Sequence, residues 1–307
     1  MKAIFVFSGQ GAQFVGMGKD LKEASPAAAA IFAEADKILG WSVSGVCFEG
    51  PEEKLTESRY CQPAIYTMSA ACLAAFREKN PSVQALGAAG LSLGEYAAMY
   101  AAGVLSFANG LRLVARRAEL MDEACRQSDG AMASVLGGEV PAIREVCALC
   151  EIDVANYNCP GQVVISGARP GVEKAIAALK EKGFRKVIPL KVAGAYHSRL
   201  MQEAGDKLRD VLAQTPMNAP TLPVAQNFIG AVSPQDLTVI KDNLYRQVAG
   251  SVRWEDCVRA LAALGADTVI EFGPGAVLTG LAKRIDGQLA TANIGSLEGL
   301  EKFGAAS

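Results

Sequence analysis

A serine flanked by two glycines constrains this 307-residue chain more than any other feature of its sequence. Residues 90–94 have the sequence Gly-Leu-Ser-Leu-Gly, with Ser92 at the centre. The apolar run over 84–91 predicts a strand and residues 93–102 predict a helix, so the serine would occupy a sharp strand–turn–helix connection. Backbone N–H groups and the dipole at such a helix start favour a developing oxyanion. The pattern indicates a nucleophilic serine, and the alternative is an ordinary glycine-rich turn.

The rest of the chain alternates between strand-like and helix-like segments, which predicts an α/β fold with a parallel sheet. A long helix is expected over 63–79. The middle of the chain differs, because its segments follow the order β-α-β-β-α-β of a ferredoxin-like unit, from a strand over 131–136 to one over 186–192. We therefore expect a large α/β-hydrolase-like domain with a parallel sheet, formed by residues 1–128 and 194–307. A small ferredoxin-like domain of residues 129–193 would be inserted in it.

Charge and hydropathy exclude several classes of protein. The 30 basic and 32 acidic residues give a net charge of −2, which argues against a nucleic-acid or membrane-surface protein. No apolar run approaches the roughly 20 residues of a membrane span, and the N-terminus is too short for a signal peptide. We therefore expect a cytoplasmic protein with reduced cysteines. Cys147 and Cys150, on a predicted helix, are expected in the core rather than on a metal ion.

A serine needs a base to act as a nucleophile at neutral pH, and the chain contains a single histidine, His197. This histidine follows a predicted strand, in a loop of the kind where α/β active sites form. If Ser92 works by serine–histidine chemistry, His197 has to be the base. A third group should orient the imidazole, and the candidates are Asp153, Asp206 and a backbone carbonyl.

A second glycine-flanked segment follows the first predicted strand. Residues 9–13 have the sequence Gly-Gln-Gly-Ala-Gln, and Phe14 stands where the dinucleotide-binding fingerprint requires its third glycine. A dinucleotide cofactor is therefore not expected. Gln10, at the C-terminal end of a strand, can instead place its amide and its backbone N–H beside the serine.

Together these segments resemble the malonyl-CoA:acyl-carrier-protein transacylases, the acyltransferase family of bacterial fatty-acid synthesis and of polyketide synthases. The resemblance runs almost end to end. Besides residues 9–13 and the serine motif, which here extends over 90–96, it includes 114–121, 158–164, 194–198, 226–227, 244–248 and 273–278. Six or seven motifs in order are far more specific than any one of them.

The resemblance implies a role for each residue of the site. Ser92 would be acylated, and His197 would act first as general base and then as general acid. The backbone carbonyl of Gln247 would hold the ring N–H of His197. The backbone N–H groups of Gln10 and Leu93 would form the oxyanion hole.

The resemblance also implies how the acyl group is bound. Arg117 would pair bidentately with the malonyl carboxylate, which suits a planar guanidinium. Asn158 and Tyr196 would contact the substrate. Arg116 is adjacent in sequence, and since consecutive helical residues point about 100° apart, only one of the two arginines can face the cleft. Spacing alone does not choose between them.

The chain departs from the family pattern at three positions. Leu91 stands where the family usually has histidine, Ser8 where proline is common, and Tyr196 where phenylalanine is frequent. Because Tyr196 would line the acyl pocket, these departures leave the strictness of malonyl selection open.

The implied reaction has two halves and follows ping-pong kinetics. Ser92 attacks the thioester of malonyl-CoA and CoA leaves, after which the phosphopantetheine thiol of acyl carrier protein takes the malonyl group. We expect a monomer with no metal and no cofactor of its own. The alternatives are a stand-alone polyketide-synthase acyltransferase using malonyl-CoA or a related acyl-CoA, a serine thioesterase or hydrolase, and a non-catalytic carrier-docking subunit.

Overall fold

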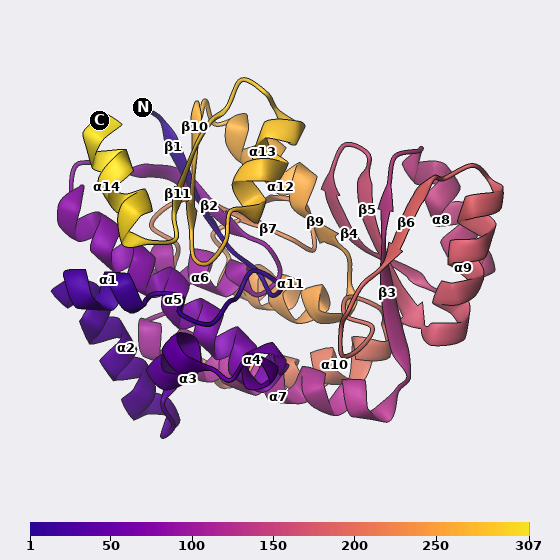
Figure 1. Ribbon diagram of the computed structural model, residues 1–307, viewed down its shortest axis with the longest axis horizontal. Helices are drawn as coiled ribbons and strands as arrows, with labels where there is room; N and C mark the ends of the chain where they lie inside the picture. Colours follow the sequence, from indigo (N-terminus) through magenta and orange to yellow (C-terminus); the bar gives the residue numbers. More distant parts are fainter. Residues whose placement is uncertain (307) are drawn as a thin grey trace.

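The computed structural model describes residues 1–306, which form two β-sheets with helices packed against them (Figure 1). The strands of the larger sheet are, in spatial order, β11 (Ala290–Ile294), β10 (Thr268–Phe272), β1 (Ala3–Phe7), β2 (Ala85–Gly90), β7 (Val224–Gln226) and β8 (Ala231–Val232). All neighbours in this sheet run parallel except β7 and β8. The chain is therefore a mixed α/β protein, as the alternation of its segments predicts.

Helices cover both faces of the larger sheet, because both faces of its strands are apolar. In β1, the side chains of Phe5 and Phe7 point into one core and those of Ile4 and Val6 into the other. The second core contains α12 (Trp254–Ala262) and α13 (Val277–Ile285). The first contains α2 (Pro26–Leu39), α3 (Val43–Glu49), α5 (Ser58–Lys79), α6 (Gly94–Ala101), α7 (Phe107–Gln127), α10 (Gln202–Gln214), α11 (Leu237–Ala249) and α14 (Leu297–Ala306).

Two short helices, α1 (Lys19–Ala24) and α4 (Glu52–Thr56), complete this part of the chain together with the 3₁₀ turn Arg199–Met201. Across residues 1–306, no helix combines the length and the apolar character needed to cross a membrane.

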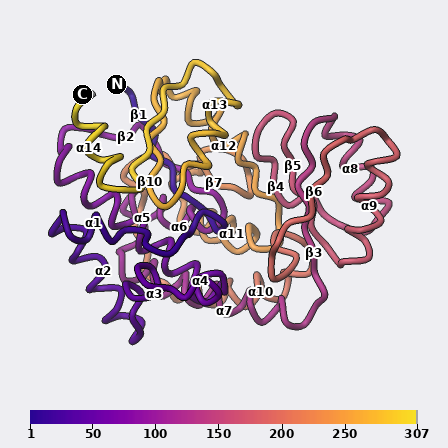
Figure 2. Tube along the Cα trace, in the orientation of Figure 1, coloured from indigo at the N-terminus to yellow at the C-terminus, as the bar shows by residue number. Residues whose placement is uncertain are grey.

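The smaller sheet has the order β6 (Lys186–Pro189), β3 (Gly130–Leu136), β5 (Gln162–Ala168), β4 (Asp153–Cys159) and β9 (Val252–Arg253). Its first four strands are antiparallel, and α8 (Val140–Leu149) and α9 (Arg169–Glu181) pack on it through a separate apolar core. Cys147 and Cys150 lie in that core, as expected. The chain enters this part after α7 and leaves it after β6 (Figure 2).

The fifth strand of the smaller sheet, β9, comes from a distant part of the chain and runs parallel to β4. Sequence patterning did not predict it, because two residues are too few to show an alternating pattern. The smaller sheet therefore includes residues outside 129–193.

Two predicted boundaries are wrong. The long helix α5 begins at Ser58, so Pro63 lies inside it, and burial of most of this helix outweighs the hydrogen bond that proline cannot donate. The strand expected over 186–192 ends at Pro189, one residue before a last backbone hydrogen bond from Leu190 to Met132 of β3 at 2.9 Å. The next residues, from Leu190 to Val192, line a cavity instead.

The connection between β2 and α6 holds Ser92 in the left-handed backbone region, with φ of 53°. A Cβ at Gly90 would overlap the backbone carbonyl group of Gly94, and a Cβ at Gly94 would overlap the carbonyl oxygen of Phe7. Both glycines are therefore required by the close approach of two backbone segments. Their spacing around Ser92 follows from this approach.

We expect Gly94→Ala to lower the free energy of unfolding by at least about 2 kcal/mol, because rotation of a side chain cannot relieve a clash with backbone. Urea unfolding measures the change. Gly280→Ala is the matched control: a Cβ at Gly280, in α13, has no atom within 4 Å. This alanine should raise stability by about 0.5–1 kcal/mol. A Gly94→Ala protein as stable as the parent would contradict the argument.

Candidate active site

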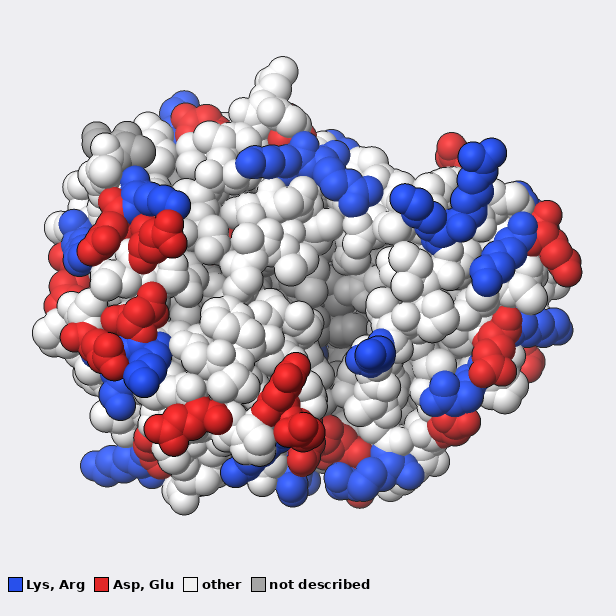
Figure 3. Space-filling model, viewed as in Figure 1, with Lys and Arg blue, Asp and Glu red and all other residues white. Residues whose placement is uncertain are grey.

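A cavity of about 700 Å³ lies between the two parts of the molecule. The space-filling view shows a hollow at this place, with a mostly uncharged visible surface (Figure 3). The larger part contributes Ser92, and the smaller part contributes Asn158 and Val164. Apart from His197, the residues with basic side chains in its lining are Arg117 and Lys191.

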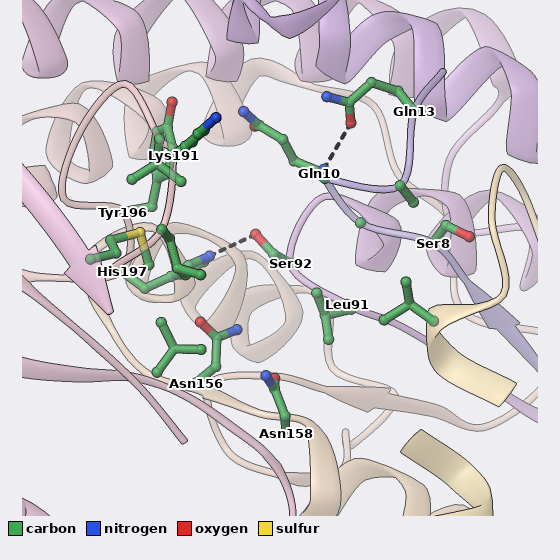
Figure 4. A pocket seen from close by; sticks show the side chains of 18 of the residues that line it. Ser8, Gln10, Gln13, Leu91, Ser92, Asn156, Asn158, Lys191, Tyr196 and His197 are labelled. Carbon is green, nitrogen blue, oxygen red and sulfur yellow. Dashed lines mark hydrogen bonds between the residues drawn. The ribbon is translucent and has the colours of Figure 1, made fainter. Parts of the chain in front are cut away.

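Ser92 and His197 meet in this cavity (Figure 4). The Oγ of Ser92 lies 2.7 Å from Nε2 of His197, and Nδ1 of His197 lies 2.8 Å from the backbone oxygen of Gln247. A carbonyl oxygen only accepts hydrogen bonds, so Nδ1 carries the proton and Nε2 accepts the hydroxyl hydrogen of Ser92. This tautomer is the one that a general base requires.

The backbone carbonyl of Gln247 orients the imidazole of His197, a role for which the sequence left three candidates. Asp153 pairs with Arg199 instead, at 2.8 Å. Asp206 accepts a hydrogen bond from Gln202 within α10.

His197 is 5% exposed, and burial, together with the nearby Arg117, lowers its pKa from 6.5 to about 4. The imidazole is therefore neutral near pH 7 and free to accept a proton. Like Ser92, this residue has a left-handed backbone conformation, with φ of 56°. Backbone strain of this kind in non-glycine residues is concentrated at functional sites.

Arg117 is the buried arginine of the pair that sequence spacing did not separate. It is 1% exposed, whereas the exposed Arg116 pairs with Glu119 at 2.8 Å. Nη1 of Arg117 donates to Oε1 of Gln62 at 2.7 Å, and Nη2 donates to Oγ of Ser92 and to Oε1 of Gln247, both at 3.0 Å. Burial lowers its pKa, and its Nε is buried without a hydrogen-bond partner in the described residues. This guanidinium is held by neutral groups and has spare capacity for an anion.

Two backbone N–H groups near Ser92 remain without a protein acceptor among residues 1–306, those of Gln10 and Leu93. Gln10 lines the cavity, and Leu93 caps the start of α6. The N–H of Ser92 itself donates to Oδ1 of Asn227 at 2.7 Å. The two N–H groups that the resemblance implies as donors to the oxyanion therefore make no hydrogen bond within the described residues.

The remaining predicted residues also line the cavity. The hydroxyl oxygen of Tyr196 lies 2.8 Å from Oγ of Ser58, and the buried Oδ1 of Asn158 has no partner among the described residues. An unpaired buried acceptor is costly unless a ligand or water satisfies it. Of the positions that depart from the family pattern, Leu91 lines the cavity as well, and Ser8 donates to the carbonyl of Pro274 at 3.0 Å.

Several polar residues that hydrogen-bond to residues of the site, without lining the cavity, were not assigned a role from sequence. Gln62 lies within an almost wholly buried stretch of α5, and Glu95 within the buried α6. Asn227 is buried at the end of β7. A glutamine or glutamate in an otherwise apolar helix was the available signal, since a buried polar side chain needs partners.

A neutral buried imidazole, hydrogen-bonded to a serine at a strand–helix turn with free N–H groups beside it, defines the class of enzymes that form acyl-serine intermediates. The acyl transferase domain family matches residues 4–293. The malonyl CoA-acyl carrier protein transacylase of Bacillus subtilis (strain 168) is 42% identical over 305 residues, which cover 98% of this chain and 95% of that protein.

Solved structures agree. The acyl-carrier-protein S-malonyltransferase of Burkholderia pseudomallei 1710b has a TM-score of 0.95 at 40% identity, over 99% of this chain and 100% of that one. A malonyl-transacylase in complex with its type II PKS acyl-carrier protein has a TM-score of 0.96 at 36% identity, over 100% of both chains. The chain belongs to the malonyl CoA-acyl carrier protein transacylase family of acyl transferases, which confirms the resemblance seen in the sequence.

The single histidine allows a direct test of the site's electrostatics. We expect the imidazole Cε1–H resonance of the folded protein to titrate with a midpoint near pH 4 rather than 6.5, since burial and Arg117 both disfavour the charged form. Arg117→Ala should raise the midpoint, and Arg116→Ala should leave it unchanged because Arg116 points to solvent. A midpoint near 6.5 in protein that circular dichroism shows to be folded would contradict the buried site.

Proposed function

We propose that this chain transfers the malonyl group of malonyl-CoA to the phosphopantetheine thiol of acyl carrier protein, through a malonyl ester of Ser92. The observation that carries the proposal is the position of the Ser92 Oγ, 2.7 Å from the only imidazole and 3.0 Å from a buried guanidinium. The names of the relatives, which include both malonyl-CoA and acyl carrier protein, support it.

In the first half-reaction, Oγ of Ser92 attacks the thioester carbonyl while its proton passes to Nε2 of His197. The carbonyl of Gln247 stabilises the imidazolium through its Nδ1–H, and the N–H groups of Gln10 and Leu93 bind the oxyanion. Collapse of the tetrahedral intermediate breaks the C–S bond. The proton on Nε2 then goes to the sulfur of the departing CoA, and malonyl-Ser92 remains.

The second half-reaction reverses these steps with a new acceptor. The phosphopantetheine thiol gives its proton to Nε2 of His197 and attacks the ester carbonyl, and the departing Oγ of Ser92 takes the proton back. Nucleophile, base and oxyanion donors all come from the chain itself, so we propose no cofactor and no metal.

Arg117 supplies the selection for an acyl group that ends in a carboxylate. In the free protein its Nη2 donates to the Oγ of Ser92, a contact that the malonyl carboxylate would replace while Nε gains its missing acceptor. An acetyl group would leave these donors unpaired in a buried site, which costs about 1–3 kcal/mol. Asn158 and Tyr196 would complete the wall of this acyl pocket.

The division into domains stays a proposal. We propose an α/β-hydrolase-like catalytic domain, residues 1–128 and 194–307, and a ferredoxin-like domain, residues 129–193. What supports the second is the chain order β3-α8-β4-β5-α9-β6 with the spatial order β6-β3-β5-β4. A cytoplasmic location and a monomeric state also remain predictions.

Polyketide synthesis is the second pathway to consider, because one structural relative is a malonyl-transacylase bound to a type II PKS acyl-carrier protein. The same chemistry would serve either carrier. A thioesterase would use the same serine and histidine with water as the acceptor, and release of free malonate rather than transfer to a carrier thiol distinguishes it.

We expect Ser92→Ala to abolish formation of a covalent malonyl adduct, because Ser92 supplies the one hydroxyl that residues 1–306 place in hydrogen-bond contact with Nε2 of His197. Intact-protein mass spectrometry after incubation with malonyl-CoA measures the adduct. Ser106→Ala, at the exposed N-cap of α7, is the matched control and should keep it. An adduct of unchanged yield on the Ser92→Ala protein would exclude the mechanism.

We expect Arg117→Ala to lower the ratio of malonyl to acetyl acylation by roughly 10- to 100-fold, since a charged hydrogen bond to the carboxylate is lost. Separate incubations with malonyl-CoA and acetyl-CoA give the two rates. The neighbouring Arg116→Ala should leave the ratio unchanged. If Arg116→Ala lowers it instead, the acyl pocket has been placed on the wrong face of α7.

A further inference from the structure

A buried carboxylate that the reaction scheme does not use lies three residues after Ser92. Glu95 is 0% exposed within α6 and accepts three hydrogen bonds. Its Oε1 accepts from Nε2 of Gln226 at 3.0 Å, and its Oε2 accepts from the backbone N–H of Asn227 at 2.9 Å and from Nε2 of Gln247 at 3.0 Å. All three partners are donors, which suits an ionised carboxylate rather than a protonated one.

The carboxylate is one of three groups that set which end of the Gln247 amide faces Arg117. The Nε2 of Gln247 donates to Glu95 and also to the backbone oxygen of Ser92 at 2.9 Å, so Oε1 points the other way and accepts from Nη2 of Arg117. A flipped amide would set its oxygen against a carboxylate and a carbonyl, and its NH₂ against a guanidinium. The negative charge of Glu95 therefore acts with the Ser92 carbonyl and the Arg117 guanidinium to disfavour the flipped orientation.

A second link runs from Glu95 to the turn that carries Ser92. The backbone N–H of Asn227 donates to Glu95, while its side chain accepts from the N–H of Ser92 at 2.7 Å and donates to the oxygen of Gly90 at 2.8 Å. Both links end on groups that touch the nucleophile. Glu95 itself touches neither Ser92 Oγ nor the cavity.

We propose that Glu95 is a positioning residue for acyl selection: its carboxylate orients the Gln247 amide so that Oε1 holds Arg117 in place for the malonyl carboxylate. The same carboxylate fixes Asn227, which holds the backbone of Ser92. This inference rests on the proposed acyl-transfer function and extends it to a residue outside the cavity.

The charged and titratable groups around Glu95 are few. Arg117 on α7 is the charged group that lowers its pKa, and Cys257 on α12 and the neighbouring Tyr96 keep their protons because burial raises the pKa of each. His197 on the loop after β6 is neutral above about pH 4. Burial raises the pKa of Glu95 to about 7, against the opposing effect of its three donors and Arg117. A protonated Glu95 would place an O–H against three hydrogen-bond donors and would weaken its hydrogen bond with Gln247.

The test measures acylation of Ser92 by malonyl-CoA and by acetyl-CoA in the wild-type protein and in Glu95→Gln, between about pH 5.5 and 8.5. The ratio of the two rates cancels the titration of His197 and of the CoA phosphates, which both substrates share. We expect Glu95→Gln to lower the malonyl/acetyl ratio at least about tenfold. The wild-type ratio should fall as pH decreases through about 7, while the Glu95→Gln ratio should not depend on pH.

Glu95→Asp keeps the charge and should restore much of the ratio, which a loss of packing alone would not allow. Glu173→Gln, on the exposed surface of α9, is the matched control and should behave as wild type. A folded Glu95→Gln protein that keeps both the ratio and its pH dependence overturns the positioning role. A wild-type protein that forms no malonyl-serine overturns the proposed function instead.

If Glu95→Gln does not fold, Gln247→Ala takes its place. This variant removes the link to Arg117 but leaves the backbone carbonyl for His197, and it leaves Glu95 with its donors Gln226 and Asn227. A loss of malonyl preference of at least about tenfold is expected. An unchanged ratio in folded Gln247→Ala would overturn the inference.

Discussion

The hydrogen bond between Ser92 and His197 depends on three segments that are far apart in the sequence. The serine sits on the turn after β2, the histidine on the loop after β6, and the carbonyl that orients the imidazole at the end of α11. Two of the three residues need left-handed backbone conformations, and the turn that carries Ser92 is possible only because Gly90 and Gly94 let two backbone segments approach closely. The distance between Ser92 and His197 is therefore a consequence of how the larger sheet, α6 and α11 pack. This packing fixes the backbone of both residues and so the positions of their side chains.

The buried charges of Arg117 and Glu95 are hydrogen-bonded to amide groups and do not form a direct ion pair with each other. Arg117 contacts Gln62 and Gln247, and Glu95 contacts Gln226, Gln247 and the backbone of Asn227. A direct buried ion pair would neutralise the guanidinium and weaken its attraction for an incoming carboxylate. The Gln247 amide lies between the two charges, so it stabilises both while one nitrogen of the guanidinium stays unpaired. The proposed selection of an acidic acyl group by Arg117 depends on this incomplete neutralisation.

The sequence predicted the parts of the fold that depend on local patterning. The β2–turn–α6 unit, the parallel sheet and the order of segments in the middle of the chain each have a period or a glycine spacing that sequence shows directly. The single histidine left one possible base, and the structure brings it to Ser92. The choice of the Gln247 carbonyl and of Arg117 over Arg116 came from the resemblance. A backbone carbonyl has no residue-type signature. Glu95 lies in the serine motif but received no role, and Gln62 and the two-residue β9 were not predicted, because their roles exist only through distant tertiary partners.

The smaller sheet also bears on the chemistry, through the segment that follows Gln247. Gln247 provides the carbonyl that orients His197. Four residues later in the chain, Ser251 donates its hydroxyl hydrogen to the carbonyl of Val154 at 2.6 Å, and Val252 pairs with β4. Arg284 of α13 donates to the carbonyl of Pro160, at the turn between β4 and β5. The two parts are thus joined at two places, by a strand at β4 and by a guanidinium at the turn after it. Because the segment carrying the Gln247 carbonyl continues into a strand of the smaller sheet, a shift of that sheet would displace the group that orients the base. The placement of the smaller sheet is therefore part of the catalytic geometry as well as a wall of the substrate cavity.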